Sequence, residues 1–357
     1  MDRFEVRVSI TKLLLVLIVV IVPLSVLGLV LTSRSDKSLD NAIGNDFKAL
    51  AQTFSNGVSD YVRERVADVN AMAAESNVIN AVIAANHGVQ EKSAAGGAPK
   101  GMLTSSASDF LKQRRNLDPR YLRIVATDEN GNVVAAAQQP TKLSFAQDDD
   151  WQAAYNKGQG AVRISEILDD ELAKAYYVTI GVPIGDPNSG HLVGVLSAAV
   201  NISPLLARFQ QDQIGNGARA ALVNEDGSVI SGPNADIFAR VKSREFDAIR
   251  DSLGAAQGRQ AGWALASLQN GPYLVGYAST GLKQHFDNLG WYVLVSQEEH
   301  QAAAPIRQLE RFALVMVVLA IFMLTLLCVY YFLHRKQRFE DIEVLPEGHS
   351  RAAAASM

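Results

Sequence analysis

Two long apolar runs, residues 13–31 near the start and residues 312–333 near the end, bracket most of this chain. Neither run contains a charged residue. At a rise of about 1.5 Å per residue, each is long enough to cross the hydrocarbon core of a bilayer as a helix. We therefore expect transmembrane helices over residues 13–33 and 312–333, with residues 34–311 together on one side of the membrane.

The basic residues that flank the two runs predict the orientation. Under the positive-inside rule, the tails 1–12 and 334–357 are cytoplasmic and residues 34–311 are extracytoplasmic, at the plasma (inner) membrane of a bacterium. A cleaved signal peptide is the alternative for the first run, but its apolar stretch is long and residues 31–33 make a poor cleavage site. The flanking cations are Arg3, Arg7, Lys12, Arg335, Lys336 and Arg338.

Charge and cysteine content narrow the function classes. The chain has a formal net charge of −4 and no basic block between the two runs. Nucleic acid is therefore not an expected partner, because binding it requires clustered Lys and Arg. The single cysteine, Cys328, lies in the second run, so the outward segment has no disulfide and must rely on packed cores.

The outward segment opens with helical sequence. Apolar residues recur at steps of three and four from about residue 35 to residue 85, which predicts one long amphipathic helix continuing from the first run. Residues 86–101 are rich in Gly and Ala without a period and predict an exposed loop. A second helix is expected over residues 106–116, which completes a helical region over 34–117.

A repeat follows the helical region. Residues 122–137 read LRIVATDENGNVVAAA and residues 219–233 read RAALVNEDGSVISGP. Each is an apolar strand, a polar turn that ends in Gly, and another apolar strand, as in a hairpin. Later strand-like runs complete each unit, at residues 175–183 and 191–202, then 273–280 and 290–297. The pattern predicts an α+β fold with two antiparallel sheets and helices on their faces.

Three further motifs carry a family resemblance: DWQAAY at residues 150–155 with Gly158 and Gly160, GVLSAAVNI at 194–202, and GWYVLVSQ at 290–297. With the long first helix, their order resembles a double Cache sensor, the tandem PAS-like extracytoplasmic module of bacterial receptors. The resemblance implies a membrane-distal module over 118–210 that binds a small metabolite above its sheet. It also implies a membrane-proximal module over 211–311 that couples this pocket to the second span.

One branch of that family recognises amino acids, and this chain matches its residue set only in part. Trp151 matches the family's Trp, and Asp170 matches one Asp. Asp149 stands where the family has Arg, and Asn201 where it has a second Asp. An amino acid needs a cation for its carboxylate and an anion for its ammonium group, so standard amino-acid recognition is not expected.

Other candidates follow from their positions in the predicted elements. Tyr155 lies one helical turn after Trp151, so both rings can share one pocket wall, although ordinary packing is an alternative. Residues 148–150 precede this helix and fit an N-cap and favourable first-turn charges. Tyr121 and Arg123 alternate with apolar residues and are expected on one strand face. The candidate ligand-binding residues are Trp151, Tyr155, Tyr121, Arg123, Arg163, Asp170, Tyr177 and Asn201.

Chemistry other than ligand binding is not indicated. No nucleophile–base motif, phosphate-binding loop or metal-ligand spacing occurs, so we expect no enzyme, cofactor or metal site. The acidic residues 169–171 are expected in a solvated loop. The 24-residue tail 334–357 is short for an effector.

The leading hypothesis is therefore a membrane sensor that passes a conformational signal to a separate cytoplasmic or membrane partner, with a homodimer as an option. The alternative is a membrane-anchored scaffold whose outer domain binds another protein. A sealed, wholly apolar pocket in the first module would favour that alternative.

Overall fold

The computed structural model describes residues 10–88, 102–211, 214, 217–255, 260–269 and 271–304, together with short helical stretches between 314 and 330. The chain divides into two compact units, Met1–Ala302 and Ala303–Met357. No helix among the described residues combines the length and the hydropathy that a membrane span requires. The predicted terminal tails lie outside the described residues, except for the start of the first helix.

The first unit begins with a 64-residue helix, α1 (Ile10–Ala73), which runs on from the first apolar run without a break. The predicted single helix to residue 85 is in fact two helices, because Glu75 has an extended backbone and serves as the N-cap of α2 (Ser76–Asn86). This break lets Val78, Ile79 and Val82 of α2 be buried. Most of the predicted loop, residues 89–101, lies outside the described residues.

The helix predicted over residues 106–116 is confirmed as α3 (Ser106–Leu117). The side chain of Ser105 caps this helix by accepting a hydrogen bond from the backbone N–H of Ser108 at 3.2 Å. Asp109 in the first turn and Arg114 and Arg115 in the last turn complement the helix dipole.

The first sheet is antiparallel with strand order β2-β1-β6-β5-β3, and β4 pairs with β5 off this path. The hairpin predicted over 122–137 is confirmed, and Gly131 in its turn has the positive φ of +78° that glycine tolerates. The strands are β1 (Tyr121–Asp128), β2 (Val133–Ala136), β3 (Arg163–Ile164), β4 (Leu168–Asp170), β5 (Ala175–Gly185) and β6 (Leu192–Asn201). The short helices are α4 (Asp149–Tyr155), η1 (Asn156–Gly158) and α5 (Ser203–Leu206).

The second sheet repeats this arrangement with strand order β8-β7-β11-β10-β9. In both sheets a hairpin lies at one edge and the strand that closes the unit pairs beside it, which confirms the predicted repeat. The strand β9 was not predicted from the sequence. The strands are β7 (Arg219–Asn224), β8 (Val229–Ser231), β9 (Ala261–Leu268), β10 (Gly271–Ser279) and β11 (Trp291–Glu298). The helices are α6 (Arg244–Ala255), η2 (Ile237–Ala239) and η3 (Leu282–Gln284).

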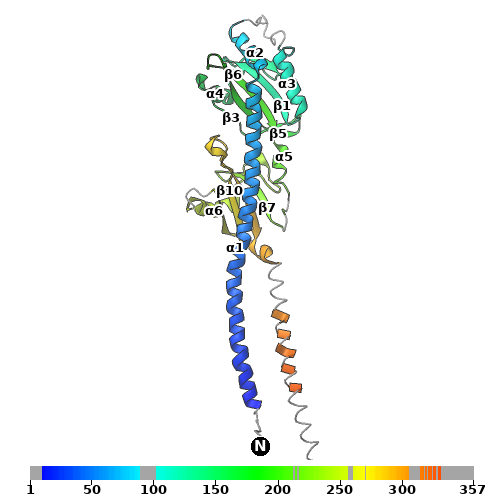
Figure 1. Ribbon diagram of the computed structural model, residues 1–357, viewed down its shortest axis with the longest axis vertical. Helices are drawn as coiled ribbons and strands as arrows, with labels where there is room; N and C mark the ends of the chain where they lie inside the picture. The colour runs from blue at the N-terminus through cyan, green and yellow to red at the C-terminus, as the bar shows by residue number, and fades with distance from the viewer. Residues whose placement is uncertain are drawn as a thin grey trace, which may run out of the picture. The chain divides into compact units, whose positions relative to one another are not determined.

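The helix α1 joins the two sheets into one unit, since it packs on β9, β10 and β11 and then on β5 and β6 (Figure 1). Its apolar stripe, from Phe47 to Met72, contributes to one continuous core with residues of both sheets. Gly276 permits the close approach of α1 to β10, because a Cβ there would lie 2.4 Å from the backbone carbon of Phe47.

The faces turned away from α1 differ between the sheets. In the second module, defined here as the second sheet with α6, η2 and η3, α6 covers this face with Phe246 and Ile249 against Val275 and Leu294. In the first module, the first sheet with α2 to α5, the smaller helix α4 packs there on β5, β6 and β3. The first sheet therefore keeps space on this face for a cavity.

Candidate ligand-binding site

A cavity of about 530 Å³ lies over the first sheet, on the face opposite α1. Strand alternation explains which residues line it, since successive side chains point to opposite faces. Along β5, Tyr177 and Thr179 line the cavity with Gly181. The intervening Val178 and Ile180 are buried in the core shared with α1.

The two neighbouring strands complete the floor, and two segments form the walls. Ser197 and Ala199 of β6 and Arg123 and Val125 of β1 line the cavity beside β5. One wall comes from the loop after β2 and from α4, with Gln138, Gln139, Pro140, Thr141, Lys142, Phe145, Asp148, Asp150 and Trp151. The other wall comes from β4 and its turn, with Leu168, Asp169, Asp170, Glu171 and Leu172.

Trp151 lines the cavity, and burial and a hydrogen bond fix its side chain. Its side chain is buried, and its Nε1–H donates a hydrogen bond to Thr127 Oγ1 at 2.8 Å. Tyr155 stacks on the Trp151 ring with centroids 5.2 Å apart, but only Trp151 is among the lining residues. The predicted pair of aromatic faces therefore contributes one ring to the cavity wall.

The three aspartates at the start of α4 match the predicted cap only in part. Asp148 occupies the N-cap position, but its side chain makes no capping hydrogen bond. It pairs with the ammonium group of Lys142, whose Nζ also lies 4.6 Å from the centroid of the Phe145 ring. Asp149 and Asp150 lie in the first turn, where a negative charge favours the helix dipole.

Arg123 and Asp170 meet across the cavity floor. Arg123 Nη1 lies 2.5 Å from Asp170 Oδ2, and the guanidinium carbon is 4.7 Å from the centroid of the Tyr177 ring. The backbone N–H of Ala173, followed by Arg123, lowers the pKa of Asp170 below its ordinary value. Three of the predicted candidates are thus brought into direct contact.

The predicted solvated loop over residues 169–171 is wrong for Asp170. This residue lies in strand β4, paired with β5, and its side chain is only 12% exposed. Asp169 and Glu171 on either side are exposed, as expected. The isolated acidic run hides this alternation because β4 is too short to show a period.

Arg163 is held next to the cavity without lining it. Its Nε lies 3.1 Å from Oδ1 of Asp150, which is a wall residue. Arg163 belongs to β3, and its neighbour Ile164 is buried in the core. The structure therefore places Arg163 behind the wall, where it supports Asp150.

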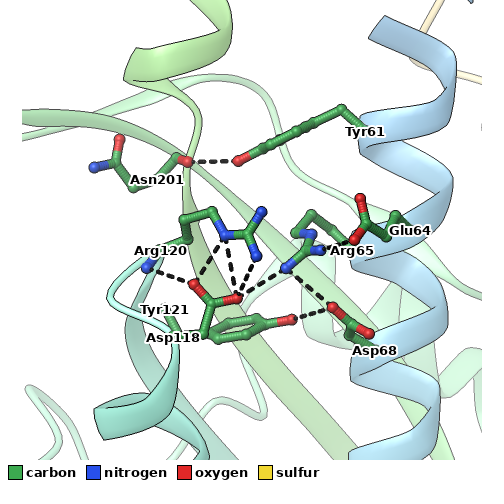
Figure 2. Close-up of polar contacts among 8 residues, drawn as sticks. All are labelled: Tyr61, Glu64, Arg65, Asp68, Asp118, Arg120, Tyr121 and Asn201. Atoms are coloured by element: carbon green, nitrogen blue, oxygen red, sulfur yellow. Dashed lines mark hydrogen bonds and ion pairs between the residues drawn. The ribbon is translucent and has the colours of Figure 1, made fainter. Parts of the chain in front are cut away.

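Tyr121 and Asn201 lie outside the cavity, toward α1 (Figure 2). The prediction that Tyr121 and Arg123 share a face is wrong, because the β1–β6 register shifts between these two residues, which indicates a bulge. The Tyr121 hydroxyl donates to Asp68 Oδ2 at 3.3 Å, and burial raises its pKa. The Asn201 carbonyl accepts a hydrogen bond from the Tyr61 hydroxyl at 2.9 Å.

Arg65 organises the polar cluster around these two residues (Figure 2). Its side chain is 2% exposed and contacts Asp118 Oδ2 at 2.9 Å and Asp68 Oδ2 at 3.0 Å. Arg120 Nε contacts Asp118 Oδ1 at 2.8 Å, and this hydrogen bond is the main cause of the lowered pKa of Asp118. The cluster fastens the start of β1 to α1.

Sequence reasoning missed this cluster and several cavity residues. Arg65 lies on the apolar stripe of α1 between Val62 and Val69, and a charge at such a position was the available signal. Thr179 and Ser197 were detectable as the small polar residues that alternate with buried ones in β5 and β6. In the described part of the chain, no group of three or more His, Cys, Asp or Glu residues is arranged to hold a metal ion.

The described part of the chain is thus a long helix that carries two tandem α+β modules, the first of which has a cavity on one face. The chain belongs to the Cache domain family, whose model matches residues 35–306. The predicted resemblance is confirmed. Cache domains are extracytoplasmic sensor domains of membrane receptors, and they bind ligands without catalysing a reaction.

The chain is also similar to solved structures whose sequences are distant from it. The sensory domain of the Campylobacter jejuni chemoreceptor Tlp3 with isoleucine bound is 14% identical, with a TM-score of 0.51 over 75% of this chain and 97% of that one. The same receptor's ligand-binding domain with 4-methylisoleucine is 15% identical, with a TM-score of 0.50 over 74% and 94%. The domain of Pseudomonas fluorescens CtaA with L-leucine is 13% identical, with a TM-score of 0.49 over 74% and 99%. No curated protein matches the sequence.

Proposed function

We propose that this protein is a membrane-anchored extracytoplasmic sensor that binds a small metabolite in the cavity of its first module. The observation that carries the proposal is the cavity itself. Its volume of about 530 Å³ falls in the range of small-molecule sites, and its lining mixes aromatic, hydroxyl and charged groups. The equivalent face of the second sheet is filled by α6, which favours the first module as the binding module.

The sequence supports the membrane anchor. The uncharged runs 13–31 and 312–333 have the length and composition of spanning helices, and α1 continues from the first run into the sensor domain. In this arrangement the first module is distal to the membrane and the second is proximal. A homodimer would pair the first helices of two chains near the membrane.

The stretch of residues 163–170 supports a route for the signal from the cavity to the second module. At one end, Asp170 contacts Arg123 in the cavity. Toward its other end, the Ile164 carbonyl accepts a hydrogen bond from Asn288 Nδ2 at 2.6 Å, and Glu166 pairs with Arg240 at 3.0 Å. A ligand that moves β4 would therefore also move contacts of the second module.

The route requires that the ligand bind two arrangements of the domain with different affinity, since otherwise it shifts no equilibrium. The second module would then displace the second apolar run, residues 312–333, and a separate partner protein would respond to this displacement. If saturating ligand left the cross-linking of cysteines placed in residues 13–31 and 312–333 unchanged, this part of the proposal would be wrong.

A thermal-shift screen of the full-length chain in detergent tests ligand binding. The panel contains amino acids, organic acids, amines and purines. A ligand at about 100 times its Kd stabilises the folded state by roughly 2.7 kcal/mol, which raises the melting temperature measurably. We expect at least one compound to do so.

The variant Ser197→Leu places any hit in the cavity. Ser197 is half-buried on the floor, where a larger side chain projects into open space and blocks a ligand without disturbing the core. Trp151→Ala is less suitable, because removing a buried Trp costs about 3–5 kcal/mol of stability. Ser267→Leu, the same change at an exposed position of β9, is the matched control.

Loss of the hit in Ser197→Leu but not in Ser267→Leu supports the sensor. A screen in which no compound raises the melting temperature would contradict the sensor proposal and favour the scaffold alternative. That alternative called for a sealed, wholly apolar cavity, whereas this cavity has charged lining residues and exposed ones such as Leu172 at its mouth. No observation therefore favours it as a second function.

A further inference from the structure

The charges that line the cavity are unequal in number and in their pairing. Five carboxylate side chains and two cationic side chains line it. Both cations are already engaged, Arg123 with Asp170 and Lys142 with Asp148. A ligand carboxylate would therefore have to break an existing ion pair before it found a cationic partner.

The cavity has more carboxylates than its own cations can neutralise, so some of them are available to a positively charged ligand. Asp169 and Glu171 make no ion pair with any described residue.

The contacts of the two lining cations show that the cavity wall accommodates positively charged groups. Each lining cation lies between a carboxylate and an aromatic face: Arg123 between Asp170 and Tyr177, and Lys142 between Asp148 and Phe145. Aromatic faces attract cations through the ring quadrupole, and a carboxylate adds charge and hydrogen bonds. Lys142 is the more exposed of the two cations, with 45% of its side chain accessible, so its ammonium group is the easier to displace.

A third carboxylate and aromatic ring also line the cavity together, without a described cation of the chain against the ring. Asp150 and Trp151 are adjacent in α4, and Arg163 contacts only Oδ1 of Asp150. Tyr155 stacks on Trp151 and supports the ring in this position.

From this charge inventory we propose that the cavity binds a small organic cation, an aliphatic or aromatic amine, in preference to an amino acid or a carboxylic acid. The inference rests on the proposed function and names the ligand class of the same site. The amine would contact Trp151 and the carboxylates of the two walls, and it would compete with the ammonium group of Lys142.

Two matched compound sets test the ligand class. One set is butylamine, γ-aminobutyrate and butyrate, and the other is phenethylamine, phenylalanine and hydrocinnamate. The butane skeleton is conserved in the first set and the phenethyl group in the second, while the charge changes from cation to zwitterion to anion. Calorimetric titration of the full-length chain uses phosphate buffer, because Tris is itself an amine. We expect the amine to bind at least about tenfold more tightly than its zwitterion, and the anion more weakly still.

The variant Lys142→Met gives opposite results for the two ligand classes. It keeps an apolar stem against Phe145 but removes the charge and frees Asp148, so amine affinity should rise about three- to tenfold. A ligand carboxylate that relied on Lys142 would instead bind more weakly. Lys283→Met is the matched control, since it removes an exposed lysine paired with Glu225 in the second module and should change no affinity.

Tighter binding of a zwitterion or an anion, weaker amine binding in Lys142→Met, or no binding by either amine would each overturn the inference. These outcomes differ from failure of the proposed function. A carboxylic acid whose binding is lost in Ser197→Leu would keep the sensor and reject only the amine.

Discussion

At the residue scale, the Arg65 cluster shows how one buried charge connects two parts of the fold. Arg65 is almost fully buried, yet its carboxylate partners Asp118, Asp68 and Glu64 are 21%, 46% and 63% exposed. Breaking a buried pair leaves an uncompensated charge, and that penalty exceeds the net value of an intact pair. Asp118 is the least exposed partner and also binds Arg120, so the cluster depends most on this carboxylate.

We predict that Asp118→Asn lowers the free energy of unfolding by about 1–3 kcal/mol at neutral pH. Hydrogen bonding to Arg120 holds the folded pKa of Asp118 below its ordinary value of 3.8. Its contribution is therefore complete above that value and is lost as the pH falls through the lower folded pKa. Urea unfolding followed by circular dichroism, from pH 7 down to about pH 2, measures both effects.

The control for this prediction is Asp109→Asn. Asp109 pairs with Lys112 but is 68% exposed, so losing this pair and its helix-dipole contribution should lower the free energy of unfolding by less than about 1 kcal/mol. A stability difference between wild type and Asp118→Asn that persists undiminished in acid would contradict the assigned role of this carboxylate.

Some of the residues that line the cavity were predictable from a motif or from strand alternation. Trp151 followed from a family motif, and Arg123 and Tyr177 from strand alternation. Tyr121 was misplaced because a bulge in β1 reverses the alternation, and a bulge leaves no reliable trace in a single sequence. Lys142 was missed because its place in the wall depends on how the loop after β2 folds back over the sheet.

At the element scale, Gly276 of β10 and Gly57 of α1 differ in the space around them. At Gly276 the backbones of α1 and β10 approach closely, and an added Cβ would overlap the Phe47 backbone. Gly57 lies within α1, where an added Cβ meets only Arg208 Nη1 at 3.9 Å. The first position needs glycine for space, whereas the second does not.

We predict that Gly276→Ala lowers the free energy of unfolding by about 1–3 kcal/mol, because the helix must move away from the sheet. Gly57→Ala should raise it by about 0.5–1 kcal/mol, because alanine favours the helix and restricts the unfolded chain. Urea unfolding measures the free energy of unfolding of both variants. Equal effects of the two substitutions would contradict this packing of α1 on β10.

The larger elements were predictable because their hydrophobic periods are long. The amphipathic stripe gave α1, and the two Gly-terminated hairpins gave the repeat and its sheets. The end of α1 was not predictable, since the apolar period continues past Glu75 and only the extended backbone there separates α2. The strands β3 and β4 are too short for a period, and β9 has an exposed Leu265 and a buried Ala266 that disguise its alternation.

At the scale of the whole molecule, the question is whether the two modules respond to one another. Beyond the shared helix α1, the stretch 163–170 contacts both the cavity and the second module. Coupling between two sites is reciprocal, so a change at either end of a real route must be felt at the other. This requirement can be tested without a ligand.

We predict that Asn288→Ala, a change in the second module, raises amide hydrogen exchange in residues 163–172 of the first module. Loss of the hydrogen bond to the Ile164 carbonyl should accelerate exchange there by about threefold or more. Arg123→Gln, which breaks the pair with Asp170, should in turn accelerate exchange around residues 286–291. Hydrogen exchange read by mass spectrometry measures both variants, with Arg244→Gln on α6 as the control. If each increase stays within the module that carries the substitution, these contacts do not couple the two modules. The signal would then have to pass through α1.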